Sequence, residues 1–216
     1  MKEYIDDIFM SKDELMKHLA DESKVFNNPA IKEAFEAIDR QDFVTDDYKV
    51  EAYEDYPLPT MGGQTISQPT TVAFMLELLD PKPGNTVLDI GSGSGWTTAL
   101  LGHLVGKEGK VIGLEIKPEL VELGQENIKK YKNLSNIEIK QADKETGYYR
   151  NAPYDRILAG AAFTKSEIPL ELMLQLVNGG IMVVPVGDSI IKYEKVDDDQ
   201  FYETKYPGFA FVPYMS

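Results

Sequence analysis

The chain has no cysteine and only two histidines, His18 and His103, among its 216 residues. Without cysteine it can form no disulfide, thiolate nucleophile or zinc site built on cysteine sulfur. The two histidines fall in separate helical patterns, so a histidine metal centre or a Ser-His-Asp relay lacks the residues it needs. We therefore expect no metal site, and a reaction that requires neither a thiolate nor an imidazole base.

Basic residues are also scarce, because 22 lysines and arginines stand against 36 aspartates and glutamates and give a net charge of −14. Such an excess of negative charge repels phosphate backbones, so we expect no nucleic-acid partner. No apolar run approaches the length of a membrane span, and the opening "MKEYIDDIFMSKDEL" has no apolar signal core. These observations predict a cytoplasmic protein without a membrane partner.

The first sixty residues predict an acidic, helical N-terminal extension or lid. Residues 11–14 have the form of a capping box, and Asn28-Pro29 opens a second helix with proline at its first position. A segment rich in proline and glycine follows, and a third helix is predicted over 69–79. We expect this extension, residues 1–60, to flank a larger domain over 61–216.

From residue 86 onward, short apolar strands alternate with helices. Strands are predicted at 86–90, 110–116, 136–142, 154–160 and 180–186, with helices up to about 105, from Pro118 and over 169–177. This alternation predicts an α/β fold, doubly wound, with a mostly parallel sheet covered on both faces. Two further segments flank the acidic turn "DDD" and predict a C-terminal antiparallel hairpin, which makes seven strands in all.

A glycine-rich loop follows the first of these strands, in the sequence "LDIGSGSGW". Gly91, Gly93 and Gly95 lie at the carboxyl end of a strand and at the start of a helix, where parallel sheets bind their ligands. The dinucleotide fingerprint has its third glycine where this chain has Trp96, so the loop does not favour a hydride-transfer enzyme.

Acidic residues accompany this loop at the ends of three consecutive strands. Asp89 precedes the loop, Glu115 ends the second strand, where it can accept hydrogen bonds from ribose hydroxyls, and Asp143 ends the third. Together with the loop, these acids predict a nucleotide-like ligand. The alternatives are an α/β domain whose glycines only form tight turns and, for Asp143 alone, a solvated acid in a loop.

The combination is typical of class I methyltransferases that use S-adenosylmethionine. Within that class the chain resembles the protein-L-isoaspartate O-methyltransferase family over nearly its whole length. The segments that carry the resemblance are "EAYEDYPLP", "GGQTISQP", "VLDIGSGSGW", "GKVIGLEI", "APYDRILAGAA", "QLVNGGIMVVPVG" and "FVPY". "QTISQP" is the most discriminating, because general methyltransferases share the glycine loop and lack this segment.

The resemblance implies a Rossmann-like methyltransferase fold, S-adenosyl-L-methionine as cofactor, and methylation of the α-carboxyl of L-isoaspartyl residues in damaged proteins or peptides. Separately, we expect a monomer. The resemblance makes Ser67 the catalytic residue. It implies substrate contacts from Gln64, Thr65, Ile66, Ala161 and Ala162, and cofactor contacts from Asp89, Gly91, Ser92, Gly93, Gly95, Glu115, Ile116, Asp143 and Lys144.

Three departures from the family pattern keep two other functions open. The third-strand acid lies in Ala142-Asp143-Lys144, where the family usually has Gly-Asp-Gly; the loop 161–169 is about two residues longer than usual; and the chain ends three residues after Pro213. The longer loop favours a related methyltransferase that acts on another peptide or small carboxylate. Lys144 and the short tail favour a binding module with weakened catalysis.

Methylation of a carboxylate suits a chain with so few bases. A carboxyl group with a pKa near 4 is already ionised at neutral pH, so it needs orientation more than proton transfer. Ser67 can orient it by donating a hydrogen bond. Spacing alone favours Ser67 as the N-cap of the helix over 69–79, whereas the resemblance favours the catalytic role, and the two roles can coexist.

Overall fold

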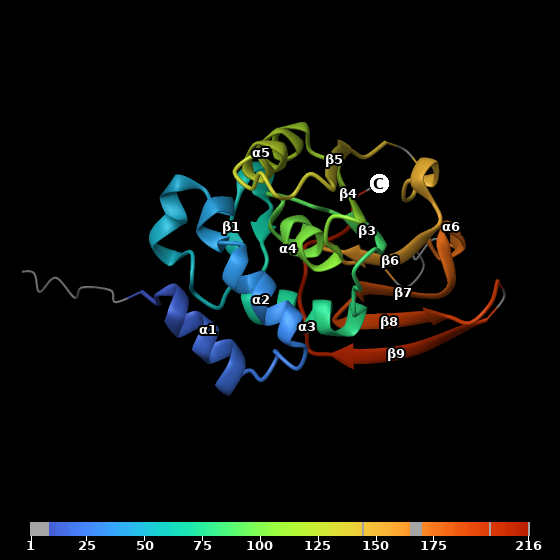
Figure 1. Ribbon diagram of the computed structural model, residues 1–216, viewed down its shortest axis with the longest axis horizontal. Helices are drawn as coiled ribbons and strands as arrows, with labels where there is room; N and C mark the ends of the chain where they lie inside the picture. Colours follow the sequence, from blue (N-terminus) through green and yellow to red (C-terminus); the bar gives the residue numbers. More distant parts are fainter. Residues whose placement is uncertain (1–8, 144, 165–169, 199, 216) are drawn as a thin grey trace, which may run out of the picture.

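The computed structural model describes residues 9–143, 145–164, 170–198 and 200–215. Its centre is a seven-stranded sheet in the order β5-β4-β3-β6-β7-β8-β9 (Figure 1). The strands are β3 (Thr86–Ile90), β4 (Lys110–Glu115), β5 (Ile137–Gln141), β6 (Tyr154–Ala159), β7 (Leu176–Val186), β8 (Ser189–Lys195) and β9 (Phe201–Pro207). A separate two-stranded pair is formed by β1 (Leu58–Pro59) and β2 (Thr65–Ile66).

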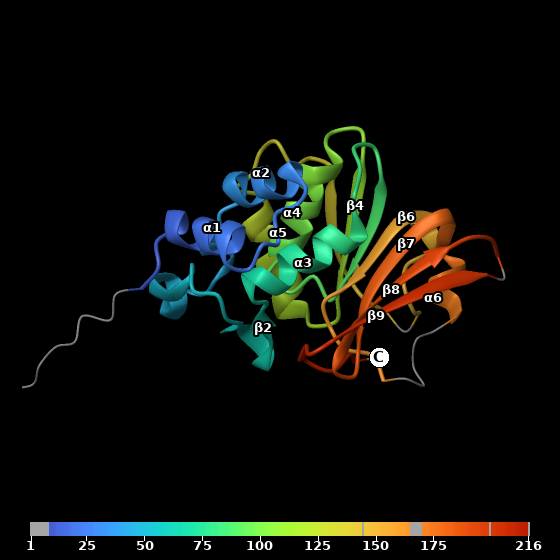
Figure 2. The ribbon, with the colours of Figure 1, turned by 90° about the horizontal axis from the view of Figure 1, so that it is seen from below.

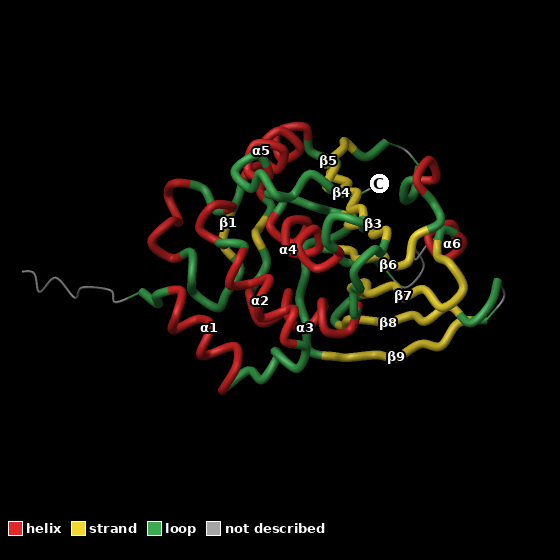
Figure 3. Tube along the Cα trace, in the orientation of Figure 1, coloured by secondary structure: helices red, strands yellow, loops and turns green. Residues whose placement is uncertain are grey.

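The sheet is mostly parallel, as predicted. Parallel pairing joins β5, β4, β3, β6 and β7, and antiparallel pairing adds β8 and β9, so the predicted C-terminal hairpin is confirmed (Figure 3). The chain runs outward from β3 to β5 and then returns to place β6 on the other side of β3. The carboxyl ends of β3 and β6 therefore form the switch point at which open α/β sheets bind ligands.

Helices cover both faces of this sheet. On one face lie α3 (Pro69–Leu79), α4 (Trp96–Val105) and α5 (Pro118–Ile128), and on the other lies α6 (Leu170–Leu174) (Figure 2). Alternate residues of each strand enter separate apolar clusters: Val87 and Val111 pack on the first face, and Leu88 and Ile112 on the second. Burial on both faces explains why the strands read as nearly continuous apolar runs.

The N-terminal segment forms an outer helical layer over α3 and α4 (Figure 2). Its elements are α1 (Lys12–Asp21), α2 (Pro29–Ala37) and two short 3-10 helices, η1 (Arg40–Phe43) and η2 (Asp46–Glu51), and a third, η3 (Met61–Gly63), precedes β2. The capping box from Ser11 to Glu14 and the Asn28 cap before Pro29 are both present, as the sequence predicted. Leu19 and Ile31 are fully buried in the same apolar cluster as α4, so this layer shares the core of the sheet.

The boundary between α6 and β7 differs from the prediction. The predicted helix over 169–177 ends at Leu174, and β7 begins at Leu176 rather than at residue 180. The glycines in "LVNGG" favour a turn, but here they form a bulge inside the strand, because β6 pairs with β7 through Tyr154 and Leu176 and then through Arg156 and Ile181. Within the part of the chain that the structure describes, no helix is both long and apolar enough to span a bilayer.

Candidate active site

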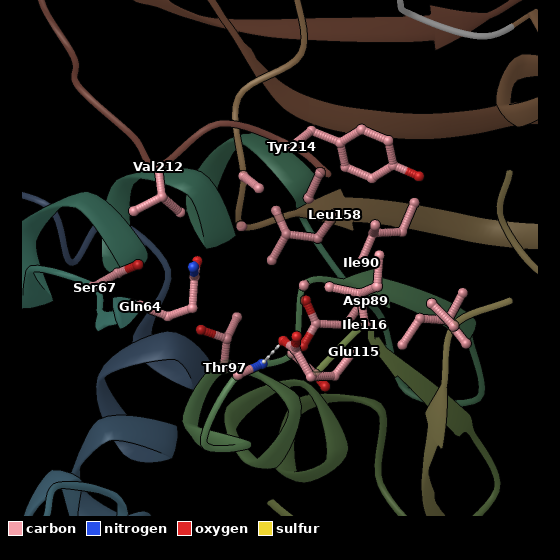
Figure 4. A pocket seen from close by; sticks show the side chains of 18 of the residues that line it. Gln64, Ser67, Asp89, Ile90, Thr97, Glu115, Ile116, Leu158, Val212 and Tyr214 are labelled. Atoms are coloured by element: carbon pink, nitrogen blue, oxygen red, sulfur yellow. Dashed lines mark hydrogen bonds between the residues drawn. The ribbon is translucent and has the colours of Figure 1, made fainter. Parts of the chain in front are cut away.

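A pocket opens at the switch point, where the carboxyl ends of β3 and β6 meet (Figure 4). Its floor is the glycine loop after β3, and its walls come from the ends of β4, β5 and β6, from the segment around β2, and from the chain after β9. Of the residues predicted for the site, Gln64, Thr65, Ile66, Ser67, Asp89, Gly91, Ser92, Gly93, Glu115, Ile116, Asp143 and Ala161 line it. The fold thus gathers in one place residues that lie up to 97 positions apart, from Gln64 to Ala161.

The glycine loop is fixed to the neighbouring strand β4. The backbone N–H groups of Gly91 and Ser92 both donate to the carbonyl of Leu114, at 2.8 and 2.9 Å. Gly95 is the N-cap of α4, with φ +90°, and does not line the pocket. A Cβ on Gly95 would lie 3.3 Å from the backbone of Gly124, so this glycine allows α4 and α5 to pack closely.

Asp89 is a carboxylic acid buried beneath the pocket. Its side chain accepts a hydrogen bond of 2.6 Å from the Thr98 hydroxyl, and the residue is 1% exposed. Burial raises the pKa of Asp89 to about 6, the Thr98 hydrogen bond opposes that rise, and the nearby charge of Glu115 adds to it. The ionised form is therefore costly in the protein alone, and a cationic group in the pocket would stabilise it.

Glu115 is held in place by backbone donors on both of its carboxylate oxygens. Its Oε2 accepts from the N–H of Gly93 at 2.9 Å and its Oε1 from the N–H of Lys117 at 3.0 Å. Figure 4 shows this carboxylate at the floor of the pocket, near Asp89. Each oxygen of an ionised carboxylate can accept about two hydrogen bonds, so both can still accept from hydroxyls of a ligand.

Asp143 lines the pocket just after the end of β5 and is exposed. Its side chain accepts a hydrogen bond of 2.8 Å from the N–H of Glu145, which makes a local turn after β5. Lys144, also predicted to contact the cofactor, lies outside the described residues, as do residues 165–169 of the longer loop.

Ser67 lies between β2 and α3, and its hydroxyl points toward the interior of the pocket (Figure 4). Its backbone carbonyl accepts a hydrogen bond of 3.1 Å from Arg40 Nη2. The prediction that Ser67 caps α3 is wrong, because the N-cap is Gln68, which makes no side-chain cap bond. Asp55, remote in sequence, instead accepts from the N–H of Thr70 at 2.8 Å, so the Ser67 hydroxyl is not used for capping.

The chain after β9 forms a wall that the predicted site residues did not include. Phe211, Val212, Tyr214 and Met215 line the pocket. Ala162 does not line it but anchors this wall, since its N–H donates to the carbonyl of Val212 and its own carbonyl accepts from the N–H of Tyr214, both at 2.8 Å. The sequence "FVPY" signalled the family, but only the folded chain shows where it lies.

The charged side chains in this lining are carboxylates. They are Asp89, Glu115, Asp143 and Glu145, and the described residues that line the pocket include no lysine, arginine or histidine. Nor do the described residues contain a group of three or more side chains able to hold a metal ion. The pocket therefore suits a ligand that carries positive charge and hydroxyl groups.

Comparison with known proteins decides the family. A sequence profile described as "Protein-L-isoaspartate(D-aspartate) O-methyltransferase (PCMT)" matches residues 10–216. The chain belongs to this family. Among its relatives, the protein-L-isoaspartate O-methyltransferase of Methanopyrus kandleri is 42% identical over 85% of this chain and 82% of its own length. The protein-L-isoaspartate O-methyltransferase 2 of Archaeoglobus fulgidus is 41% identical over 94% of each chain.

Solved structures of the protein-L-isoaspartate O-methyltransferase family share the fold over nearly the whole chain. One protein-L-isoaspartate O-methyltransferase matches with a TM-score of 0.84 and 25% identity, over 95% of this chain and 66% of that chain. A candidate family member from Plasmodium falciparum, solved in complex with S-adenosyl-L-homocysteine, matches with a TM-score of 0.82 and 25% identity, over 94% of this chain and 96% of that chain. The resemblance that the sequence predicted is confirmed.

Proposed function

We propose that this family member transfers the methyl group of S-adenosyl-L-methionine to the α-carboxyl of L-isoaspartyl residues in damaged proteins and peptides. The observation that carries the proposal is one pocket that joins Asp89 and Glu115, the buried acids beside the glycine loop, to the Ser67 hydroxyl. The names of the relatives support the same activity, since they are protein-L-isoaspartate O-methyltransferases and match most of this chain.

The residues at the strand ends fit this cofactor. The buried Asp89 is better stabilised beside a cation than alone, and the fixed carboxylate of Glu115 has free lone pairs for the two hydroxyls of a ribose. Apolar side chains of Ile90, Ile116 and Leu158 provide surfaces for the rest of the molecule. Bound there, S-adenosylmethionine supplies a methyl group on a positively charged sulfur, which a carboxylate oxygen accepts without any proton transfer.

The substrate carboxylate is held in our proposal by neutral donors. The substrate carboxylate is ionised at neutral pH because its pKa is near 4, so the enzyme does not need a base to deprotonate it. Ser67, Gln64 and Thr65 offer hydroxyl and amide donors at the mouth of the pocket. Orientation by such donors can contribute on the order of 7–11 kcal/mol. The apolar side chains of Phe211 and Val212 line the same pocket, where exclusion of water would favour the transfer.

The proposal includes a protein or peptide substrate, no nucleic acid, and a monomer. Light scattering at assay concentrations, with and without S-adenosylmethionine, tests the monomeric state; a stable dimer would contradict it.

Two measurements on the wild-type protein test the activity. Calorimetry with S-adenosylmethionine measures binding, and release of methanol from the methyl ester measures turnover on an isoaspartyl peptide, with the matching aspartyl peptide as control. We expect binding, and methanol only from the isoaspartyl peptide. Binding without methanol release would favour a related methyltransferase for another carboxylate or a binding module, and no binding would overturn the assignment.

A further inference from the structure

Arg40 lies under the active site with its guanidinium bonded to four backbone carbonyls. The residue is 2% exposed. Its Nη1 donates to the carbonyls of Ala52 and Glu54, at 2.7 and 3.1 Å, and its Nη2 donates to those of Tyr56 and Ser67, both at 3.1 Å. One side chain from η1 thus ties the segment 52–56 to the backbone of Ser67.

The same guanidinium also contacts the glycine-loop half of the site. Its Cζ lies 5.3 Å from the centroid of the Trp96 ring, a cation–π contact, and Trp96 is both the first residue of α4 and part of the pocket lining. Burial lowers the pKa of Arg40 to about 10, so the group stays charged at neutral pH. Arg40 therefore links the Ser67 segment to the helix that follows the glycine loop.

Asp55 holds the chain on the other side of Ser67. Its Oδ1 accepts from the N–H of Thr70 at 2.8 Å, its Oδ2 accepts from the Thr70 hydroxyl at 2.7 Å, and its backbone carbonyl accepts from the side chain of Gln68 at 2.9 Å. Ser67 itself lies outside regular structure, since β2 ends at Ile66 and α3 begins at Pro69. The position of Ser67 thus depends on Arg40 before the helix and on Asp55 at its start.

We propose that Arg40 is a positioning residue for methyl transfer, which sets the Ser67 hydroxyl against the glycine-loop side of the pocket, with Asp55 fixing the adjoining start of α3. The proposal rests on the proposed function through the role of Ser67. Its physical basis is that a displacement of about 1 Å between reacting groups can cost on the order of 100-fold in rate. One hydrogen bond joins Arg40 to the carbonyl of Ser67, and three hydrogen bonds to the segment 52–56 and the contact with the Trp96 ring hold Arg40 itself in place.

Arg156 provides a matched control. It is a half-buried arginine at β6 whose guanidinium donates to the carbonyls of Asp80 at 3.2 Å and Asp155 at 2.8 Å. It does not line the pocket. Arg156→Met therefore removes a partly buried cation and its carbonyl bonds without touching the Ser67 segment, and it reports what loss of stability alone does to turnover.

The kinetic test compares Arg40→Met, Arg40→Lys and Arg156→Met on an isoaspartyl peptide. We expect Arg40→Met to lower kcat/KM for the peptide about 100-fold while the Kd for S-adenosylmethionine changes less than about threefold. Arg40→Lys should recover about tenfold, because it keeps the charge and can donate to one of the carbonyls. The proposal would be overturned if kcat/KM fell no further in Arg40→Met than in Arg156→Met. It would also be overturned if Arg40→Met lost as much affinity for S-adenosylmethionine as it lost in kcat/KM.

Hydrogen exchange supplies a readout that does not depend on the reaction. In Arg40→Met, amides of residues 64–68 should exchange at least about tenfold faster than in wild type, while those of β3 keep their protection. Unchanged exchange over 64–68 would overturn the proposal whatever the activity. If Arg40→Met does not fold, the same measurements of kcat/KM and hydrogen exchange are made on Arg40→Lys and Asp55→Asn. A wild-type protein without methanol release would refute the proposed function instead, and the exchange data would still decide the role of Arg40.

Discussion

Replacement of Asp89 by asparagine should make the unliganded protein more stable at alkaline pH and weaken its binding of S-adenosylmethionine. Asp89 is 1% exposed, and burial raises its pKa to about 6 from an ordinary value of 3.8. Because the pKa is higher in the folded protein than in the unfolded chain, folding disfavours the ionised form. The protein therefore loses stability as pH rises from about 4 to above 6, and asparagine, which cannot ionise, removes that loss.

The size of the effect follows from the pKa rise. An increase from 3.8 to about 6, at about 1.4 kcal/mol per pH unit, corresponds to about 3 kcal/mol of unfolding free energy at pH 8. The asparagine amide oxygen can still accept the Thr98 hydrogen bond that Asp89 accepts at 2.6 Å, so little else should change. At pH 4 the carboxyl is still neutral in the folded protein and only about half ionised in the unfolded chain, so the two proteins should differ little in stability.

Urea unfolding of both proteins without cofactor, at pH 4, 6 and 8, measures this difference directly. Other acids titrate in both proteins, so their contributions cancel in the difference at each pH. Calorimetry at pH 8 should show weaker binding of S-adenosylmethionine to Asp89→Asn, because a carboxylate beneath a cationic ligand has been lost. A stability difference that does not change with pH, or cofactor affinity equal to that of wild type, would refute this account of Asp89.

Three further substitutions test other parts of the site. Ser67→Ala should retain cofactor affinity within about threefold and lose about tenfold or more of its turnover on an isoaspartyl peptide, as calorimetry and methanol release would measure; unchanged turnover would remove Ser67 from the mechanism. Glu115→Gln should weaken cofactor binding about tenfold or more, because an amide oxygen replaces only one of two carboxylate oxygens that accept backbone N–H groups, and calorimetry showing wild-type affinity would exclude that role. Gly95→Ala should lower the urea midpoint by more than Gly106→Ala, since both have positive φ but only Gly95 has backbone within 3.3 Å of the added Cβ; equal losses would show that packing there is unimportant.

Local signals predicted most of the fold. The capping box at Ser11 and the Asn28-Pro29 start are readable because a cap and its partner lie within a few residues. The predicted start of β7 was wrong because Gly179 and Gly180 favour a turn in isolation, whereas pairing with β6 stabilises a bulge at these residues. The local sequence does not indicate a pairing partner that lies more than twenty positions away.

The site residues that lie at the carboxyl ends of parallel strands could be predicted from the sequence, because open α/β sheets bind ligands there. The parts of the site that depend on long-range side-chain contacts could not be predicted. Acids at the ends of consecutive parallel strands meet at one edge of the sheet, so Asp89, Glu115 and Asp143 could be grouped from the sequence. The residue that caps α3 could not be predicted, because Asp55 accepts its hydrogen bond from Thr70, 15 positions further along the chain. Arg40 gave no sequence signal, since its carbonyl partners are backbone groups that any residue carries.

The most direct test of the central claim is to incubate the wild-type protein with S-adenosylmethionine and two peptides that differ only in an isoaspartyl or an aspartyl linkage. The account predicts a methyl ester on the α-carboxyl of the isoaspartyl peptide, located by mass spectrometry, with methanol released as the ester collapses. The aspartyl peptide should stay unmodified. Equal methylation of both peptides, or of neither while the cofactor binds, would contradict the claim that this pocket recognises the isoaspartyl linkage.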